Sequence, residues 1–240
     1  MKPLCIVDTS SLIYLSQITI RNRSLHRWLW GEFQVAYSRT VWDEIGRHFE
    51  KMGQDAKAIK RNGEQYVWPL PTTVTYERAL FGQPIEREVE AGRRCRICGQ
   101  PILRKQFFEP DLGVEKDRGE RHNCCVALDA VMEGRYCQVI FLTDDYRAVR
   151  DYADPVFQTF PLGSIWSSYD FVLYLFVRHR PRIPQNEVEA ALRDVTARVA
   201  GSGFADHTQQ AQQQWVQRLG TYNRKVKKIG QVLSQIQGGP

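Results

Sequence analysis

Long apolar runs are missing from this sequence of 240 residues. A membrane-crossing helix needs a stretch of about 18 or more apolar residues, and no such stretch occurs. The first residues lead directly into a predicted strand, which argues against a signal peptide. We therefore expect a soluble protein without a membrane span that works in the cytoplasm.

The sequence also has few motifs that would assign a role in metal binding, catalysis or disulfides to its six cysteines. It contains one Cys-x-x-Cys, at Cys95 and Cys98, and no second one that would complete a four-cysteine zinc site. No motif ties a cysteine to a general base, so we expect no catalytic thiol. Without an export signal, reduced thiols or metal ligands are better interpretations than disulfides.

Cys95 and Cys98 have two interpretations, a zinc knuckle or a pair of reduced surface thiols. Gly99 follows them and allows the tight turn of a knuckle. His122 and Cys125 are one helical turn apart near the polar edge of a predicted helix, so they could complete a structural Zn²⁺ site. The remaining cysteines that we expect to be small core residues are Cys5, Cys124 and Cys137.

The net charge is +6. This excess favours a polyanionic partner, of which nucleic acid is the commonest. Two basic groups could contact phosphates, although a solvated face is the alternative for each. The first surrounds the Cys-x-x-Cys and consists of Arg93, Arg94, Arg96, Arg104 and Lys105, and the second lies near the end of the sequence and consists of Arg224, Lys225, Lys227 and Lys228.

Short apolar runs that alternate with amphipathic segments predict an α/β fold. Polar and proline-containing segments interrupt this pattern from Lys51 to about Asp117, which predicts an insertion with local order of its own. We expect strands at 3–7, 34–38, 139–143 and, as an edge strand entered through a proline, 155–160, and helices at 12–15, 39–49, 118–133, 164–178 and 185–199.

The last segment, 205–236, carries apolar residues that alternate four and three positions apart, which is a heptad seam. The seam has three open interpretations: packing on its own domain, self-association, and docking with a partner protein. Gly220 and Gly230 weaken it, so a long free-standing coiled coil is the least expected. We expect two units, a domain of residues 1–200 and an amphipathic helix within 201–240.

Acidic residues occur at the ends of buried strands and at the border of a buried helix face, where an unpaired carboxylate is costly. Asp8 follows the first strand, and Asp144 and Asp145 follow the strand at 139–143. Glu44 borders the buried face of its helix. Because ligands bind at the carboxyl ends of parallel strands, we expect these acids to converge there. The alternative for the adjacent pair is the turn or N-cap of a helix that begins near Tyr146, a role that stays open for Asp144 even if Asp145 joins the cluster.

The predicted helix at 118–133 carries one more inward acid. At 100° per residue, Glu120 falls in the same sector as Cys124 and Leu128, whereas His122 and Asp129 fall on the opposite side. We therefore expect a buried Glu120 and a solvated Asp129. Clustered carboxylates repel one another unless cations neutralise them, and hard divalent ions such as Mg²⁺ or Mn²⁺ prefer such oxygen ligands. Paired ions of this kind can hydrolyse phosphodiester bonds.

In these motifs the sequence resembles the PIN-domain family, small metal-dependent nucleases that include the toxins of many toxin-antitoxin modules. The resemblance covers roughly residues 1–50 and 116–197, and the insertion between them is much longer than in compact members. It implies a three-layer α/β/α fold with a central, mostly parallel sheet, extended by a C-terminal helix. The matching motifs are Ile6-Val7-Asp8-Thr9-Ser10, Val41-Trp42-Asp43-Glu44-Ile45, Gly119-Glu120 and Leu142-Thr143-Asp144-Asp145.

The resemblance also implies an activity and a set of residues. It implies an endoribonuclease that cuts single-stranded or structured RNA with Mg²⁺ or Mn²⁺, in a toxin-like or RNA-processing role. The alternatives are a catalytically inactive module that binds RNA or protein, and a nuclease acting on DNA. The implied metal-binding acids are Asp8, Glu44, Glu120, which replaces the usual aspartate, and Asp145, with Asp144 assisting and Thr9, Ser10 and Thr143 orienting ligands or water.

Overall fold

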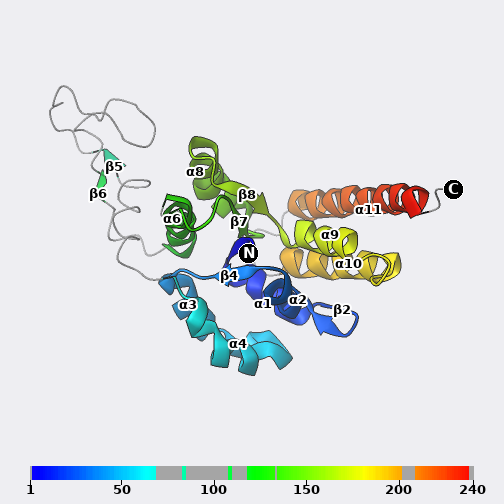
Figure 1. The fold of residues 1–240 in the computed structure, drawn as a ribbon, viewed down its shortest axis with the longest axis horizontal. Coiled ribbons are helices and arrows are strands. Elements are labelled where there is room, and N and C mark those ends of the chain that lie inside the picture. The colour runs from blue at the N-terminus through cyan, green and yellow to red at the C-terminus, as the bar shows by residue number, and fades with distance from the viewer. Residues whose placement is uncertain are drawn as a thin grey trace.

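A four-stranded parallel sheet lies at the centre of the computed structural model, which describes residues 2–68, 83–84, 108–109, 118–132, 134–201 and 209–237 (Figure 1). All neighbouring strands in this sheet pair in parallel. The strand order is β4 (Gln34–Ala36), β1 (Leu4–Val7), β7 (Val139–Leu142) and β8 (Gly163–Trp166). The expected α/β class is therefore confirmed.

Helices connect these strands. In the described ranges, no helix is both long enough and apolar enough to cross a membrane. The helical elements are α1 (Thr9–Gln17), α2 (Leu25–Glu32), α3 (Arg39–Gly46), η1 (Phe49–Asp55), α4 (Ala56–Asn62), η2 (Gly63–Tyr66), α6 (Arg118–Met132), α7 (Tyr146–Ala148), η4 (Val149–Ala153), α8 (Asp154–Thr159), α9 (Ser168–Arg178), α10 (Gln185–Gly201) and α11 (Gln209–Gln237). Two short antiparallel pairs join β2 (Thr19–Ile20) to β3 (Arg23–Ser24) and β5 (Gln83–Pro84) to β6 (Phe108–Glu109).

The strand β1 is buried on both faces of the sheet. Leu4 and Ile6 belong to one hydrophobic cluster, which also contains residues of α6 and α8. Cys5 and Val7 belong to a second cluster, built with residues of α1, α2, α9 and α10. Because alternate strand residues point to opposite faces, helices cover both sides of the sheet, in three layers (Figure 1).

The fourth strand is not where the sequence pattern predicted it. Residues 155–160 were expected to form an edge strand, but they lie mostly in helix α8. Pro155 occupies the first turn of α8, where its missing N–H costs no hydrogen bond. The actual strand, β8, takes the first residues of the segment expected to be helical, and α9 begins only at Ser168.

Helix α6 has no solvated face, contrary to the angular prediction. Gly119 and residues 122–130 are all buried, because α6 packs between α3 on one side and β1, β7 and η4 on the other. The ring Nδ1 of His122 lies 2.7 Å from the hydroxyl of Thr40. Asp129, expected in solvent, accepts a hydrogen bond of 2.6 Å from Trp68 Nε1. Cys137, expected in the core, is exposed.

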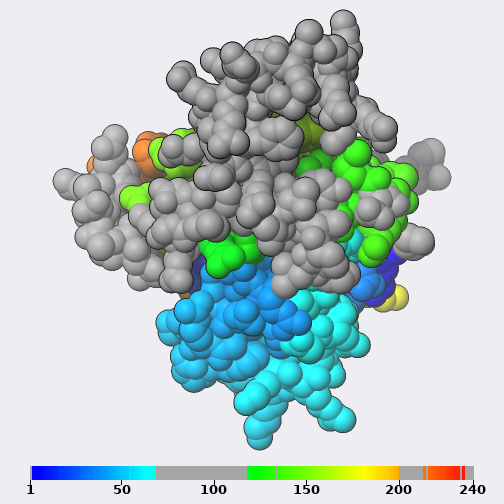
Figure 2. All heavy atoms as spheres, turned by 90° about the vertical axis from the view of Figure 1, so that its left-hand side faces the viewer, coloured from blue at the N-terminus to red at the C-terminus, as the bar shows by residue number. Residues whose placement is uncertain are grey.

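The first part of the expected insertion packs on the body of the molecule. The segment η1 lies against α1, and the buried residues Met52, Asp55 and Ile59 belong to it or to α4. Figure 2 shows α3 and the η1–α4 segment in blue and cyan on one face of the molecule, beside residues of α6 in green. Because they pack on the body of the molecule, residues 51–66 form part of the domain rather than of a separate insertion.

Helix α11 lies along α9 and α10 (Figure 1). Tyr222 and Val226 of its heptad seam are buried in the core shared with these helices. Arg180 adds hydrogen bonds to the carbonyl of Gly230, at 2.7 Å, and to Ser234, at 3.0 Å. Of the three interpretations of the seam, packing on its own domain is the one found in the described residues.

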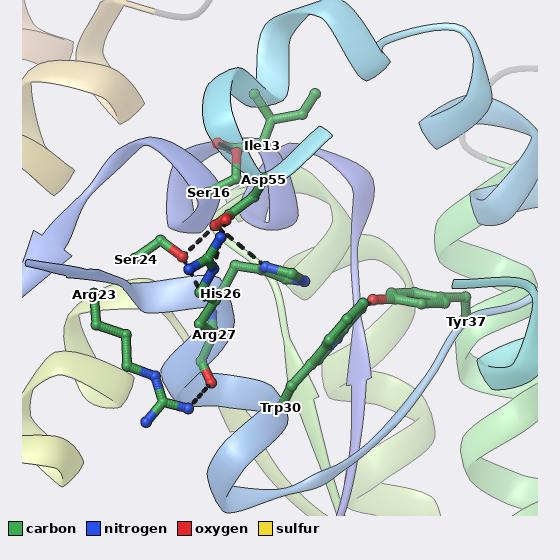
Figure 3. A network of polar contacts seen from close by, with 9 residues as sticks. All are labelled: Ile13, Ser16, Arg23, Ser24, His26, Arg27, Trp30, Tyr37 and Asp55. Carbon is green, nitrogen blue, oxygen red and sulfur yellow. Dashed lines mark hydrogen bonds and ion pairs between the residues drawn. The ribbon is translucent and has the colours of Figure 1, made fainter. Parts of the chain in front are cut away.

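A group of polar side chains centred on the buried Asp55 ties η1 to α2 (Figure 3). Asp55 is 2% exposed and accepts hydrogen bonds from the hydroxyl of Ser24 and, at 2.8 Å, from Nε of Arg27. His26 is fully buried beside it, with Nδ1 3.4 Å from an Asp55 oxygen. Neither ring nitrogen of His26 makes a well-aligned hydrogen bond within the described residues. We call Ser24, His26, Arg27 and Asp55 the Asp55 cluster.

His26 should make a destabilising contribution to the fold that grows as the pH drops from about 6.5 to about 4, opposite in sign to the contribution of Asp8. Burial lowers the pKa of His26 to about 4 from 6.5, opposed by Asp55 and supported by Arg27. In this interval the unfolded chain binds the proton and the folded chain does not, so His26 costs about 3 kcal/mol of stability by the lower end. Urea unfolding across this pH range measures the loss, and His26→Gln should remove this part of the pH dependence. An unchanged pH dependence in the variant would contradict the assignment.

Candidate carboxylate site

The carboxyl ends of the strands bring the acidic residues to one edge of the sheet. Val7 pairs with Leu142, so Asp8 follows β1 next to the place where Thr143 follows β7. The backbone N–H of Asp8 donates to the carbonyl of Leu142 at 3.0 Å, which continues the ladder by one residue. This edge is where open parallel sheets bind their ligands.

Asp8 is the most deeply buried acid of this edge. It is 3% exposed and caps helix α1, accepting a hydrogen bond of 2.7 Å from the backbone N–H of Thr9. Its other oxygen accepts from the hydroxyl of Ser10. Both carboxylate oxygens therefore have fixed directions, which a strand-to-helix junction with Thr and Ser after the aspartate supplies locally.

The electrostatic surroundings of Asp8 disfavour its charge. Burial raises its pKa from 3.8 to about 6, the hydrogen bonds from Ser10 and Thr9 lower it, and the negative charges of Glu44 and Asp145 raise it. Since charges act on one another at short range in a buried site, Asp8, Glu44 and Asp145 form one electrostatic group. A bound cation would remove the cost of keeping all three ionised.

Glu44 reaches this group from helix α3. Its Oε2 accepts a hydrogen bond of 2.8 Å from the hydroxyl of Thr9, so the residue after Asp8 orients the second acid. Gly119 of α6 lies against the same carboxylate, and a Cβ there would stand 3.0 Å from Oε1 of Glu44. Glycine therefore lets α6 approach. Glu120, the next residue, is half-buried, and its charge helps raise the pKa of the buried Cys124 thiol.

The two aspartates after β7 have different environments. Asp145 caps the short helix α7, and its Oδ1 accepts from the backbone N–H groups of Arg147 at 2.7 Å and Ala148 at 3.2 Å. It is half-buried, and its charge acts on Asp8. The sequence leaves the cap role open to Asp144, with Asp145 as the metal ligand, but the residue that caps α7 is Asp145.

Asp144 is buried and fully engaged by other elements. Its carboxylate accepts from the hydroxyl of Ser11 in α1 at 2.9 Å, and from the backbone N–H of Ser168 at 2.9 Å and the hydroxyl of the same residue. Burial raises its pKa, while these hydrogen bonds and the positive charge of Arg218 lower it. Asp144 therefore ties the end of β7 to α1 and to the start of α9.

Sequence reasoning missed the polar residues that position this edge. The side chain of Asn123 is fully buried and accepts from the backbone N–H of Ser38 at 3.2 Å. It also donates to the carbonyl of Val7 at 3.3 Å. It thereby fixes α6 against the ends of β1 and β4. An amide beside the apolar sector of α6 was its only signal, and Ser11 and Ser168 had none, because their partner Asp144 lies far away in the sequence.

The donor set of this edge suits a hard divalent cation. Carboxylate and hydroxyl oxygens are the ligands of Mg²⁺ and Mn²⁺. Within the described ranges, no three His, Cys, Asp or Glu side chains are close enough to one another to form an assembled metal centre. Asp8, Glu44 and Asp145 share one electrostatic field at this edge.

The expected zinc site and the first basic group fall largely outside the described residues. His122 and Cys125 are described, and both are buried rather than at a polar edge of α6. The zinc site stays a prediction. The members of these two predicted sites that lie outside the described ranges are Cys95, Cys98, Arg93, Arg94, Arg96, Arg104 and Lys105.

Comparison with known proteins does not identify a family. No family model, no curated protein and no solved structure matches the chain. The resemblance to the PIN-domain family therefore rests on the quoted motifs, and the α/β fold is compatible with it.

Proposed function

We propose that this protein is a Mg²⁺- or Mn²⁺-dependent nuclease, similar to PIN-domain enzymes, that hydrolyses phosphodiester bonds in RNA. The observation that carries the proposal is the position of Asp8. It is a buried aspartate at the end of a central parallel strand, its pKa is raised to about 6, and Glu44 and Asp145 act on it from two other elements. Strongly perturbed carboxylates at such an edge mark functional sites.

The residues divide into cation ligands and residues that position them. Asp8, Glu44 and Asp145 would hold the cation, which supplies an activated water and neutralises the phosphate charge. Thr9 orients Glu44 through its hydrogen bond, and Ser10 does the same for Asp8. The remaining two acids are Glu120, which stands beside Gly119 at the border of the site, and Asp144, which holds the start of α9 in place.

A catalytically silent module that binds RNA or protein is the second candidate. The observation that favours it is that the carboxylates of Asp8 and Asp144 already accept hydrogen bonds from neighbouring residues of the protein. Such a module would bind RNA equally well with and without divalent cations. A nuclease acting on DNA uses the same acids and differs only in substrate choice.

Wild-type protein should cleave single-stranded RNA in Mn²⁺ and lose this activity when a chelator is added. The measurement is a gel assay of labelled RNA and of DNA with the same sequence, with metal analysis of the same preparation for zinc. Faster cleavage of DNA would reassign the substrate. RNA binding that persists in chelator, with no cleavage of either nucleic acid in Mn²⁺, would establish the silent module instead.

A further inference from the structure

The positive charge of the chain is concentrated in one helix. Helix α11, residues Gln209–Gln237, contains five Lys or Arg residues and no Asp or Glu. It therefore accounts for five of the six net positive charges of the chain. The rest of the sequence is close to neutral in sum, so this helix is one candidate surface for a polyanion.

Helix α11 brings one of these charges to the carboxylate site. The guanidinium carbon of Arg218 lies 5.2 Å from the ring centroid of Tyr169, a distance suited to a cation–π interaction. Tyr169 follows Ser168, whose backbone N–H and hydroxyl hold Asp144. Arg218 is close enough to Asp144 for its charge to lower the pKa of that carboxyl.

Aromatic and polar contacts fix this end of α11 to α9. The rings of Tyr169 and Tyr222 stack with centroids 4.9 Å apart. The hydroxyl of Tyr222 donates a hydrogen bond to Asp170, which also belongs to the capping box of α9. The position of Arg218 relative to the site is therefore set by packing rather than by a loose side chain.

Two exposed lysines continue the charge along one side of α11. At 100° per residue, Lys225 lies within about 20° of Arg218 around the helix, and Lys228 within about 80° on the same side. Lys227 falls on the opposite side. The span from Arg218 to Lys228 is about 15 Å at the usual rise of a helix. We call Arg218, Lys225 and Lys228 the basic edge of α11.

The lysines of the basic edge are placed to meet a partner. Both are exposed, and no carboxylate within the described residues forms an ion pair with either of them. The ammonium group of Lys225 stands 4.6 Å from the ring centroid of Tyr222, a distance suited to a cation–π interaction, while the residue as a whole is exposed. Exposed positive charges along one side of a helix suit the phosphates that repeat along a nucleic-acid backbone.

We propose that the basic edge of α11 binds the phosphate backbone of single-stranded RNA and leads the strand to the carboxylate site. The inference rests on the proposed nuclease function, since it assigns the substrate path of that site. Arg218 would contact the phosphate nearest the acids, and Lys225 and Lys228 would contact phosphates farther along. Because these are backbone contacts, the binding should depend on salt and not on sequence.

The test compares two double variants that lose the same charge. K225Q/K228Q removes both lysines of the basic edge, whereas R193Q/K227Q removes two exposed charges from α10 and from the opposite side of α11. Fluorescence anisotropy with a short fluorescein-labelled single-stranded RNA, in EDTA to prevent cleavage, gives the Kd at several salt concentrations. Thermal unfolding verifies that both variants remain folded.

We expect K225Q/K228Q to bind this RNA about 10- to 30-fold more weakly near 0.1 M salt, with a log–log salt slope smaller by about 1.4. R193Q/K227Q should change the Kd by less than about threefold, because its charges lie off the path. Equal Kd values and slopes for the two double variants would overturn the inference, and so would an unmodified chain that binds no RNA.

The outcomes separate this inference from the nuclease proposal, because binding in EDTA needs no metal. Weaker binding by K225Q/K228Q, in a protein that cleaves nothing in Mn²⁺, supports the basic edge and removes the nuclease. Mn²⁺-dependent cleavage, together with normal RNA binding by K225Q/K228Q, supports the nuclease proposal and removes the basic edge as the RNA-binding surface. The Kd for single-stranded DNA of the same sequence shows whether the basic edge of α11 distinguishes the two backbones.

Discussion

Asp8→Asn should abolish Mn²⁺-dependent RNA cleavage and at the same time stabilise the metal-free fold at neutral pH. The loss of activity should be at least about 100-fold, because a cation ligand contributes several kcal/mol to the transition state. The gain in stability follows from the pKa of Asp8, which the fold raises from 3.8 to about 6. Keeping this carboxylate ionised at pH 7 therefore costs on the order of 3 kcal/mol, and asparagine carries no charge.

The pH dependence gives this prediction a definite sign. The raised pKa of Asp8 means that the folded state binds the proton more tightly, so its contribution to stability is lost as the pH rises through about 6. The gain in Asp8→Asn should thus be present at pH 7 and absent near pH 4. Thermal unfolding in EDTA at both pH values measures it.

Asp43→Asn provides the matched control for Asp8→Asn. Asp43 is adjacent to Glu44 in the sequence and is exposed, so its amide variant should keep both activity and stability. Addition of Mn²⁺ should raise the unfolding temperature of wild type and of Asp43→Asn, and not that of Asp8→Asn. If Asp8→Asn cleaved RNA at the wild-type rate, Asp8 would not be a ligand of the catalytic cation.

Asp55→Ala should lower the free energy of unfolding by about 3 kcal/mol without touching the carboxylate site. Removal of one partner from a buried, charged hydrogen-bond group leaves the others unpaired. Here the buried hydroxyl of Ser24 loses its acceptor, the buried ring of His26 loses its charged neighbour, and η1 loses its link to α2. The guanidinium of Arg27 is exposed and can turn to water. Wild-type RNA binding should persist at temperatures where the variant is folded.

Urea unfolding at pH 7 measures the effect of Asp55→Ala. Lys57→Ala, two residues further along the chain and exposed, is the control and should change the free energy of unfolding by less than about 0.5 kcal/mol. A loss in Asp55→Ala no larger than in Lys57→Ala would show that the Asp55 cluster does not stabilise the fold.

The parts of the fold that could be predicted from the sequence are those with local signals. The strands β1 and β7 are short apolar runs, and Asp8 follows β1 directly as the cap of α1. A cap depends on neighbouring residues only, so its position is visible in the sequence. Strand β8 has no such signal, because its four residues are partly exposed and include glycine and serine.

The errors came from contacts between residues that are distant in the sequence. His122 and Asp129 are polar residues on one side of α6. The angular positions of residues around a helix cannot show that Thr40 and Trp68 cover that side. The separate roles of Asp144 and Asp145 could not be predicted either. They are set by Ser168, which reaches Asp144 from another helix.

The strand order has a consequence for the synthesis of the chain. Strand β1 lies between β4 and β7, and its Leu4 pairs with Val139, 135 positions later along the chain. At ordinary translation rates, roughly 7 to 27 seconds separate the emergence of these two partners from the ribosome. During this interval, one side of an entirely apolar strand has no neighbour, which invites aggregation. The central place that buries Asp8 thus leaves β1 without its second neighbour until more than half of the chain has been synthesised.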